Sequence, residues 1–165
     1  MTTNLHRRSI RLPEFDYTQP GAYFITLVTV NRTHLFGEIV DGIFRSTPLG
    51  EIARQEWFKT AELRSYVTIN EDEFVVMPNH IHGIIHVEEH TSMANPVKAQ
   101  LRCAVTQQRC APTPFKPIQP ASLGAVVRAY KSAVTYAAHK VNLHSGKTIW
   151  QRNYYEHIIR NELDL

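Results

Sequence analysis

The sequence predicts an α+β sandwich in which helices cover one face of an antiparallel sheet. Three observations predict this fold class. Short runs of β-branched and aromatic residues are separated by turn signals, two longer segments have helical spacing of apolar residues, and the strands precede and surround the first helix rather than forming one block. At 165 residues and 43% hydrophobic content, the chain can bury one core, so we expect a single domain over 1–165.

The first third of the chain contains two strand regions. Residues 21–31 (GAYFITLVTVN) are rich in β-branched and aromatic side chains, which predicts a buried strand. In residues 38–45 the pair Asp41-Gly42 stands between two short apolar pairs, a pattern typical of a tight hairpin. We therefore expect a central strand followed by a short hairpin.

Two helices are predicted. Thr47 is a suitable N-cap and Pro48 suits the first helical position, so the first helix should run from about Pro48 to Arg64. Ser122 caps the second helix in the same way. Its predicted apolar stripe is formed by Val127, Tyr130, Val134, Ala137 and Val141, with Arg128, Lys131 and His139 on a neighbouring stripe.

The remaining strands flank the second helix. Residues 66–69 and 73–77 are strand-like, and a Pro-Asn turn separates them from a further strand at 80–87, with which we expect pairing. Beyond the second helix, residues 148–150 and 154–159 are predicted to be short extended segments.

Charge is segregated along the chain. Residues 91–155 contain nine Lys or Arg and no Asp or Glu, although the chain has 15 acidic residues in all. Such a region attracts polyanions, of which nucleic acid is the commonest, and the alternative is a solvated basic linker. Within it, residues 91–120 are rich in Pro, Ala, Gln and Thr without periodicity, which predicts a disordered insertion.

Several other classes of protein are disfavoured. No apolar stretch approaches the length of a bilayer span, and residues 1–8 lack the apolar core of a signal peptide, so we expect a soluble cytoplasmic protein. The two cysteines, Cys103 and Cys110, lie in the proline-rich region and are interpreted as free thiols rather than as a disulfide or zinc site.

Three histidines alternate along the strand at 80–87. His80, His82 and His86 should point to one face, with neighbours two residues apart separated by about 6 to 7 Å. His80 and His82 can thus converge on one divalent ion, whereas His86 lies about 13 Å from His82 and is excluded as a co-ligand. The alternative is a pair of histidines on a solvated sheet face.

Four blocks of sequence resemble the REP-associated tyrosine transposases, single-tyrosine members of the HUH superfamily. The resemblance covers most of the chain apart from the insertion, and the block near the C-terminus is the most specific. The matching blocks are VVMPNHIHGII at 75–85, GAYFIT at 21–26, SLG at 122–124 with YKSAVT at 130–135, and IWQRNYYEHIIRN at 149–161.

The resemblance implies a ferredoxin-like sheet and a divalent cation, Mg²⁺ or Mn²⁺, held by His80 and His82. It also implies that a tyrosine attacks single-stranded DNA near a hairpin, which leaves a 5′-phosphotyrosine and a free 3′-hydroxyl. The partner would be single-stranded or hairpin DNA, and because relatives can act as dimers, a homodimer is a further expectation.

The catalytic residue itself is not identified by the sequence. In the family that this chain resembles, the nucleophilic tyrosine lies on a helix after the 149–161 block, whereas here residues 161–165 offer an N-cap and a first turn. We therefore expect a C-terminally truncated or decayed member that binds DNA and metal but cleaves poorly. Tyr154 and Tyr155 are fallback nucleophiles, although packing or base stacking is the alternative for both.

Six residues are predicted to contact nucleic acid, either on the basic stripe of the second helix or near the specific block. The alternative for each is an ordinary solvated side chain. The favoured function is a transposase-type protein that binds single-stranded or hairpin DNA and, if complete, cleaves and rejoins it. The alternatives are a cleavage-dead single-stranded nucleic-acid binding module and a phosphodiesterase that uses water. The six residues are Arg128, Lys131, Lys147, Arg152, His157 and Arg160.

Overall fold

The computed structural model describes residues 15–89, 121–144 and 148–160. The predicted insertion at 91–120, the predicted incomplete turn at 161–165 and Lys147 lie outside these residues. Neither of the two described helices has the length and apolar character needed to cross a bilayer.

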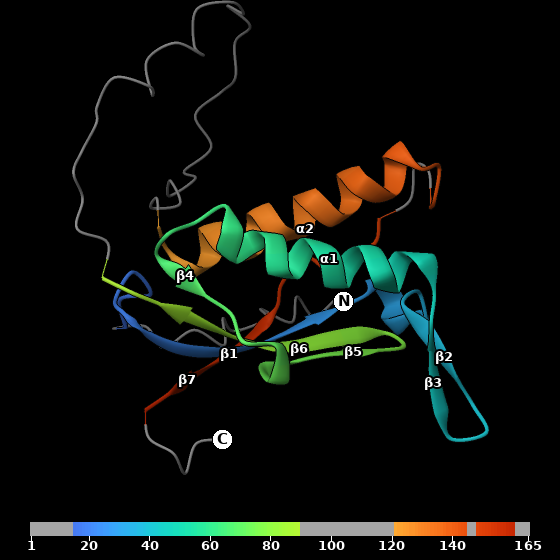
Figure 1. The fold of residues 1–165 in the computed structure, drawn as a ribbon, viewed down its shortest axis with the longest axis horizontal. Coiled ribbons are helices and arrows are strands. Elements are labelled where there is room, and N and C mark those ends of the chain that lie inside the picture. The colour runs from blue at the N-terminus through green and yellow to red at the C-terminus, as the bar shows by residue number, and fades with distance from the viewer. Residues whose placement is uncertain (1–14, 90–120, 145–147, 161–165) are drawn as a thin grey trace, which may run out of the picture.

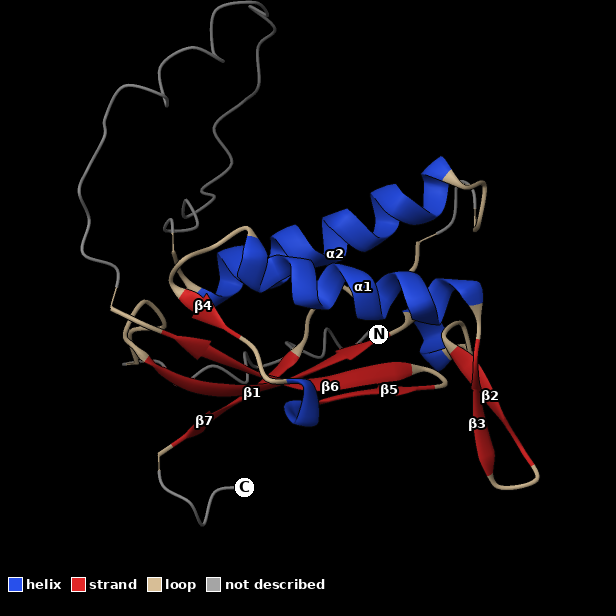
Figure 2. Cartoon of the chain, viewed as in Figure 1, coloured by secondary structure: helices blue, strands red, loops and turns tan. Residues whose placement is uncertain are grey.

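A five-stranded antiparallel sheet forms the base of the molecule, and both helices lie on one of its faces (Figures 1 and 2). Four strands follow the order β4-β6-β1-β7, and β5 also pairs with β6. This is the ferredoxin-like order, so the predicted fold class is confirmed. The elements are β1 (Gly21–Val28), α1 (Pro48–Glu62), β4 (Val67–Thr68), β5 (Phe74–Met77), β6 (His80–Val87), α2 (Leu123–Lys140) and β7 (Tyr155–Ile159).

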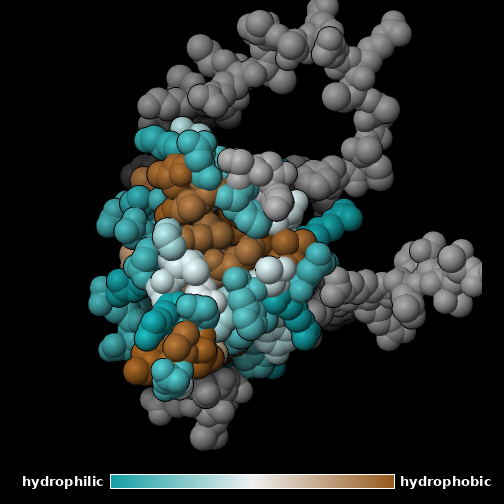
Figure 3. Space-filling view, turned by 90° about the vertical axis from the view of Figure 1, so that its right-hand side faces the viewer, coloured by the Kyte–Doolittle hydropathy of each residue, from teal (hydrophilic) through white to brown (hydrophobic). Residues whose placement is uncertain are grey.

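A separate two-stranded hairpin projects from the side of the molecule (Figure 1). It consists of β2 (Gly37–Val40) and β3 (Ile43–Ser46), as the Asp41-Gly42 signal predicts. Both turn residues have positive φ, 53° at Asp41 and 76° at Gly42, which is the geometry of a tight hairpin turn. Apolar patches are visible on this side of the molecule (Figure 3), where Ile39 and Ile43 are exposed.

Strand β1 is the centre of the sheet and pairs on both sides. It pairs with β6 from Gly21↔Val87 to Val28↔His80, and with β7 from Ala22↔Ile159 to Thr26↔Tyr155. The strand ends before the predicted Asn31, because residues Val30–Arg32 form a 3₁₀ turn (η1) in which Asn31 has a φ of 53°. Paired residues point to the same face of a sheet, and side chains alternate along each strand. The register with β1 therefore shows which side chains of β6, β1 and β7 share a face.

The helices begin where their caps predict. The Thr47 hydroxyl accepts a hydrogen bond from the Gly50 N–H at 3.1 Å, and the Ser122 hydroxyl accepts one from the Ala125 N–H at 3.3 Å. The stripe predicted for α2 is partly wrong at its end, because Val141 is the C-cap residue and its side chain is 56% exposed.

The core lies between the helices and one face of the sheet. Trp57 of α1 stacks on Phe74 at 4.8 Å between ring centroids and meets Tyr130 of α2 edge-on at 5.2 Å. Gly83 of β6 makes this possible, since a Cβ there would lie 2.3 Å from the Trp57 ring. The buried Tyr130 hydroxyl donates to the Ala53 carbonyl at 2.9 Å, which joins the two helices.

Candidate functional site

The sheet face opposite the helices, called here the open face, carries the predicted histidines. Neither described α-helix lies on this face, and the 3₁₀ turn η2 (Glu71–Glu73) lies beside β6 on this side (Figure 1). Strand pairing places side chains on it in cross-strand rows. One row is Val75, His82, Thr26 and Tyr155, the next in one direction is Met77, His80 and Val28, and the next in the other is Ile84, Phe24 and His157.

His80 and His82 lie side by side at the start of β6. Their ring centroids are 4.6 Å apart and their planes are nearly perpendicular. The Nδ1 atom of His80 lies 2.6 Å from Asn79 Oδ1, and the Nδ1 atom of His82 lies 2.8 Å from the Thr26 hydroxyl. An amide oxygen can only accept, so we assign the His80 proton to Nδ1, which leaves the Nε2 lone pair available. Partners that fix Nδ1 in this way are typical of metal-binding imidazoles.

Both imidazoles favour the neutral form. Burial lowers the pKa of His80, with a further contribution from the positive charge of Arg32. Burial likewise lowers the pKa of His82, with a contribution from His80. Neutral imidazole is the form that binds metals, so the pair is ready to act as ligands near neutral pH.

A larger ligand set is absent from the described part of the chain. Within residues 15–89, 121–144 and 148–160, no group of three or more His, Cys, Asp and Glu is placed to hold a metal ion. His86 shares the open face, but its Nε2 lies 2.7 Å from the Glu73 carboxylate, so its ring is engaged elsewhere. The site therefore consists of two imidazoles, and metal binding by them stays a prediction.

The two fallback tyrosines lie in different environments. Tyr155 begins β7, points to the open face in the same row as Thr26 and His82, and is 45% exposed. Tyr154 instead packs against the hydrophobic core, and the Lys131 ammonium lies 5.8 Å from the centre of its ring. Of the pair, Tyr155 is the one that shares a surface with the histidines.

Lys131 joins α2 to the segment that precedes β7. Its ammonium donates to the carbonyls of Gln151 and Asn153, each at 3.0 Å, and lies 5.8 Å from the centre of the Trp150 ring. Burial lowers the pKa of Lys131 to about 8. Its predicted contact with phosphate is untested, but in this structure the ammonium already has protein partners.

The other predicted nucleic-acid contacts do not form one cluster. His157 is exposed on the open face opposite Phe24, whereas Arg128 is exposed on α2, in the layer on the other side of the sheet. Arg152 and Arg160 are exposed on either side of β7. The structure thus places His157 on the same face as the histidine pair, in the neighbouring cross-strand row, and leaves Arg128 on the other side of the sheet.

Sequence reasoning missed Phe24 and Thr26. The Phe24 ring stacks on the His82 imidazole at 5.3 Å between centroids and an interplanar angle of 21°, and Thr26 holds the Nδ1 of His82. Their spacing of two within β1 is a signal that they share a face. Their closeness to His82 depends on the pairing of β1 with β6, which spacing alone does not reveal.

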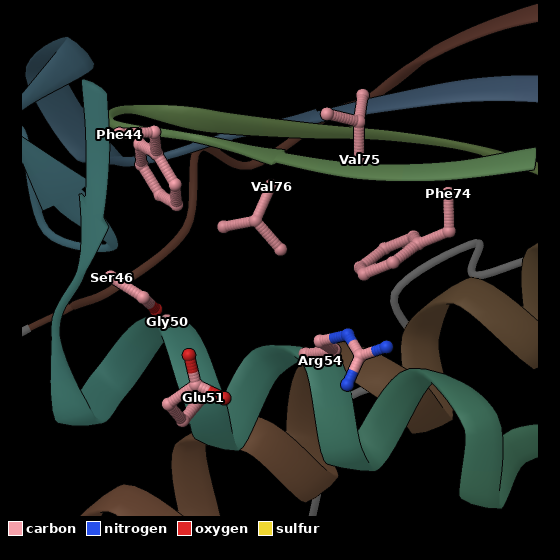
Figure 4. A pocket seen from close by; sticks show the side chains of 8 residues that line it. All are labelled: Phe44, Ser46, Gly50, Glu51, Arg54, Phe74, Val75 and Val76. Carbon is pink, nitrogen blue, oxygen red and sulfur yellow. The ribbon is translucent and has the colours of Figure 1, made fainter. Parts of the chain in front are cut away.

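A groove of about 330 Å³ lies elsewhere, between the β2–β3 hairpin, α1 and β5 (Figure 4). Its lining is mainly apolar, with the Glu51 carboxylate and the Arg54 guanidinium contributed by α1. Neither His80 nor His82 lines it. The groove therefore borders the open face at Val75 but does not contain the histidine pair.

Comparisons with known proteins agree with this architecture. No protein-family model matches the chain. The solved structure of a REP-associated tyrosine transposase bound to a REP hairpin aligns with 93% of this chain at a TM-score of 0.54 and 22% identity, and this chain spans 65% of that protein's length. The fold is therefore transposase-like.

A sequence relative gives the family. An uncharacterized protein of Haemophilus influenzae is 39% identical to this chain over 157 residues, which cover 95% of this chain and 81% of the relative. The chain belongs to the same family as that protein.

Proposed function

We propose that this protein is a REP-associated, HUH-type transposase protein that binds single-stranded or hairpin DNA and uses a divalent cation at His80 and His82. One observation carries the proposal: on a transposase-like fold, the ring centroids of two imidazoles lie 4.6 Å apart, with Asn79 at the Nδ1 atom of His80 and Thr26 at the Nδ1 atom of His82. The solved transposase of similar fold is bound to a REP hairpin, which supports DNA as the partner.

The donor set fits a transition-metal cation better than it fits Mg²⁺. The Nε2 atoms of His80 and His82 would be the protein ligands, and nitrogen donors suit Mn²⁺ better than Mg²⁺, which prefers oxygen. When bound, such an ion would withdraw charge from the non-bridging oxygens of a phosphodiester. The chain's own part is to orient the two rings through Asn79 and Thr26 and to keep them unprotonated.

The proposal also includes a reaction, in which a tyrosine cleaves and rejoins the DNA strand. The tyrosine oxygen would form a bond to phosphorus as the bond to the 3′ oxygen breaks, which conserves the phosphodiester energy for rejoining without ATP. A homodimer stays a prediction. Tyr155 is a described tyrosine on the open face, so it is a fallback nucleophile to be examined by substitution.

The test is a covalent-adduct assay with a labelled hairpin oligonucleotide that carries a single-stranded flank. A Mn²⁺-dependent species that survives denaturing electrophoresis would show that a tyrosine of this chain is the nucleophile, and His82→Ala should then abolish that species. His86→Ala is the matched control, since His86 shares the face but is engaged by Glu73. Loss of the adduct in both variants to the same extent would contradict the assigned role of the pair.

The same assay separates the alternatives. Cleaved DNA without an adduct would indicate water as the nucleophile, and salt-sensitive binding without cleavage would indicate a binding module. Metal binding is measured independently by the broadening of the His80 and His82 imidazole resonances on addition of Mn²⁺. Equal broadening at His86 would argue against a specific pair.

A further inference from the structure

Aromatic and imidazole rings continue from the histidine pair across the open face to the edge of the sheet. Thr26 and Tyr155 follow His82 in one cross-strand row, and His157 lies opposite Phe24 in the next. Because neighbouring strands are about 4.8 Å apart, the row from His82 to Tyr155 spans about 10 Å. Tyr155 is 45% exposed, although a tyrosine has apolar surface to bury.

Charge on this face suits a polyanion. Within the five described strands, no open-face position holds Asp or Glu. Glu156 of β7 lies on the opposite face, where it is 7% exposed. Carboxylates instead flank the other end of β6, where Glu73 meets His86 and Glu88 accepts a hydrogen bond from Thr68. A polyanion would be repelled from that end of β6, whereas the open-face positions of β1 and β7 present no carboxylate to it.

We propose that an unpaired DNA segment lies across β1 from the histidine pair to β7, with its bases stacked on Tyr155 and Phe24. This inference deepens the proposed function and rests on it, since it assigns the path of the single strand next to the site. Every base presents a π-face, so stacking on aromatic side chains holds single strands with little sequence preference, and four-stranded sheets with exposed aromatics bind nucleic acid in this way. His157 borders Phe24 and supplies a polar contact on the same path.

Tyr155 is the residue that tests the proposal, because its side chain is exposed and its loss should spare the core. The measurement is the dissociation constant for a short fluorescent single-stranded DNA of mixed sequence, in EDTA. We expect Tyr155→Ala to weaken binding by about five-fold or more, and Tyr155→Phe to leave it nearly unchanged, because a phenyl ring still stacks. Equal affinities for the wild type and Tyr155→Ala would overturn the proposal.

The chain offers a matched control on the opposite layer. Tyr136 of α2 is 72% exposed, so Tyr136→Ala removes an exposed tyrosine of the same size away from the open face. We expect this variant to bind like the wild type. An effect as large as that of Tyr155→Ala would show that the loss is not specific to the open face and would overturn the assignment.

A second readout reports stacking directly. A 2-aminopurine base in the oligonucleotide should lose fluorescence on binding to the wild type and recover it in Tyr155→Ala, whereas unchanged quenching would overturn the proposal. Both measurements are made without metal and do not require cleavage. Weaker DNA binding by Tyr155→Ala, together with no adduct in the wild type, would therefore support the stacking path and refute cleavage through a tyrosine. Unchanged DNA binding by Tyr155→Ala, together with an adduct in the wild type, would do the reverse.

Discussion

Lys131→Met tests whether a buried charge joins α2 to the segment before β7. The Lys131 ammonium donates to the carbonyls of Gln151 and Asn153 at 3.0 Å each, and burial lowers its pKa to about 8. Methionine keeps a flexible side chain of similar length but cannot titrate or donate. The substitution therefore removes the charge while retaining much of the packing.

The direction in which pH changes the unfolding free energy follows from the lowered pKa of Lys131. The folded-state pKa lies below the ordinary value of 10.5, so between about pH 8 and 10.5 the unfolded chain binds more protons than the folded chain. Stability should therefore rise with pH across this window, as the cost of burying the charge is relieved. The shift corresponds to about 3 kcal/mol in full, of which about 2 kcal/mol falls between pH 7 and pH 9.5.

The assay is urea unfolding of both proteins at a series of pH values. The difference in unfolding free energy between the wild type and Lys131→Met isolates Lys131, because other titrating groups are common to both proteins and the lost hydrogen bonds add a nearly constant offset. We expect the wild type to gain about 2 kcal/mol relative to the variant from pH 7 to pH 9.5. Parallel pH profiles would refute the reasoning.

Three further predictions concern the core and the histidine pair. Gly83→Ala should lower the unfolding free energy by about 1 to 3 kcal/mol, because its Cβ would lie 2.3 Å from the Trp57 ring, and unchanged urea unfolding would show that the ring can shift. Tyr130→Phe should cost about 1 kcal/mol in the same assay through loss of a buried hydrogen bond, and a more stable variant would contradict this. The imidazole resonances of His80 and His82 should titrate with midpoints below 6.5, since burial lowers both pKa values, and a midpoint above 6.5 at either residue would contradict the neutral pair.

The elements of the fold could be predicted because their signals are local. Thr47 and Ser122 mark helix starts through hydrogen bonds within one turn, and the Asp41-Gly42 pair requires nothing beyond its own φ angles. The sequence predicts a later end for β1 because Thr29 and Val30 are β-branched, like several residues of the strand before them. The turn there depends on Asn31 adopting a left-handed conformation. An asparagine in the sequence indicates such a conformation only weakly.

The candidate site was predicted in part, for a similar reason. Alternation within β6 places His80 and His82 on one face, and this needs no knowledge of other strands. The partner that holds His82 is Thr26, 56 residues away, and only the pairing of β1 with β6 brings the two together. Periodicity likewise places Lys131 on a basic stripe of α2, but it cannot show that Trp150, Gln151 and Asn153 contact the Lys131 ammonium.

The central position of β1 determines the order in which its two partner strands can pair with it during synthesis. Thr26 meets His82 across 56 residues, whereas it meets Tyr155 across more than twice that separation, so the pairing with β7 has the longer loop to close. While the chain is being synthesised, β1 and β6 can pair before β7 exists. Until β7 is added, β1 is an edge strand whose backbone groups at residues 22–26 are open to other chains. Addition of β7 then protects this edge against aggregation and adds Tyr155 to the open face in the same step.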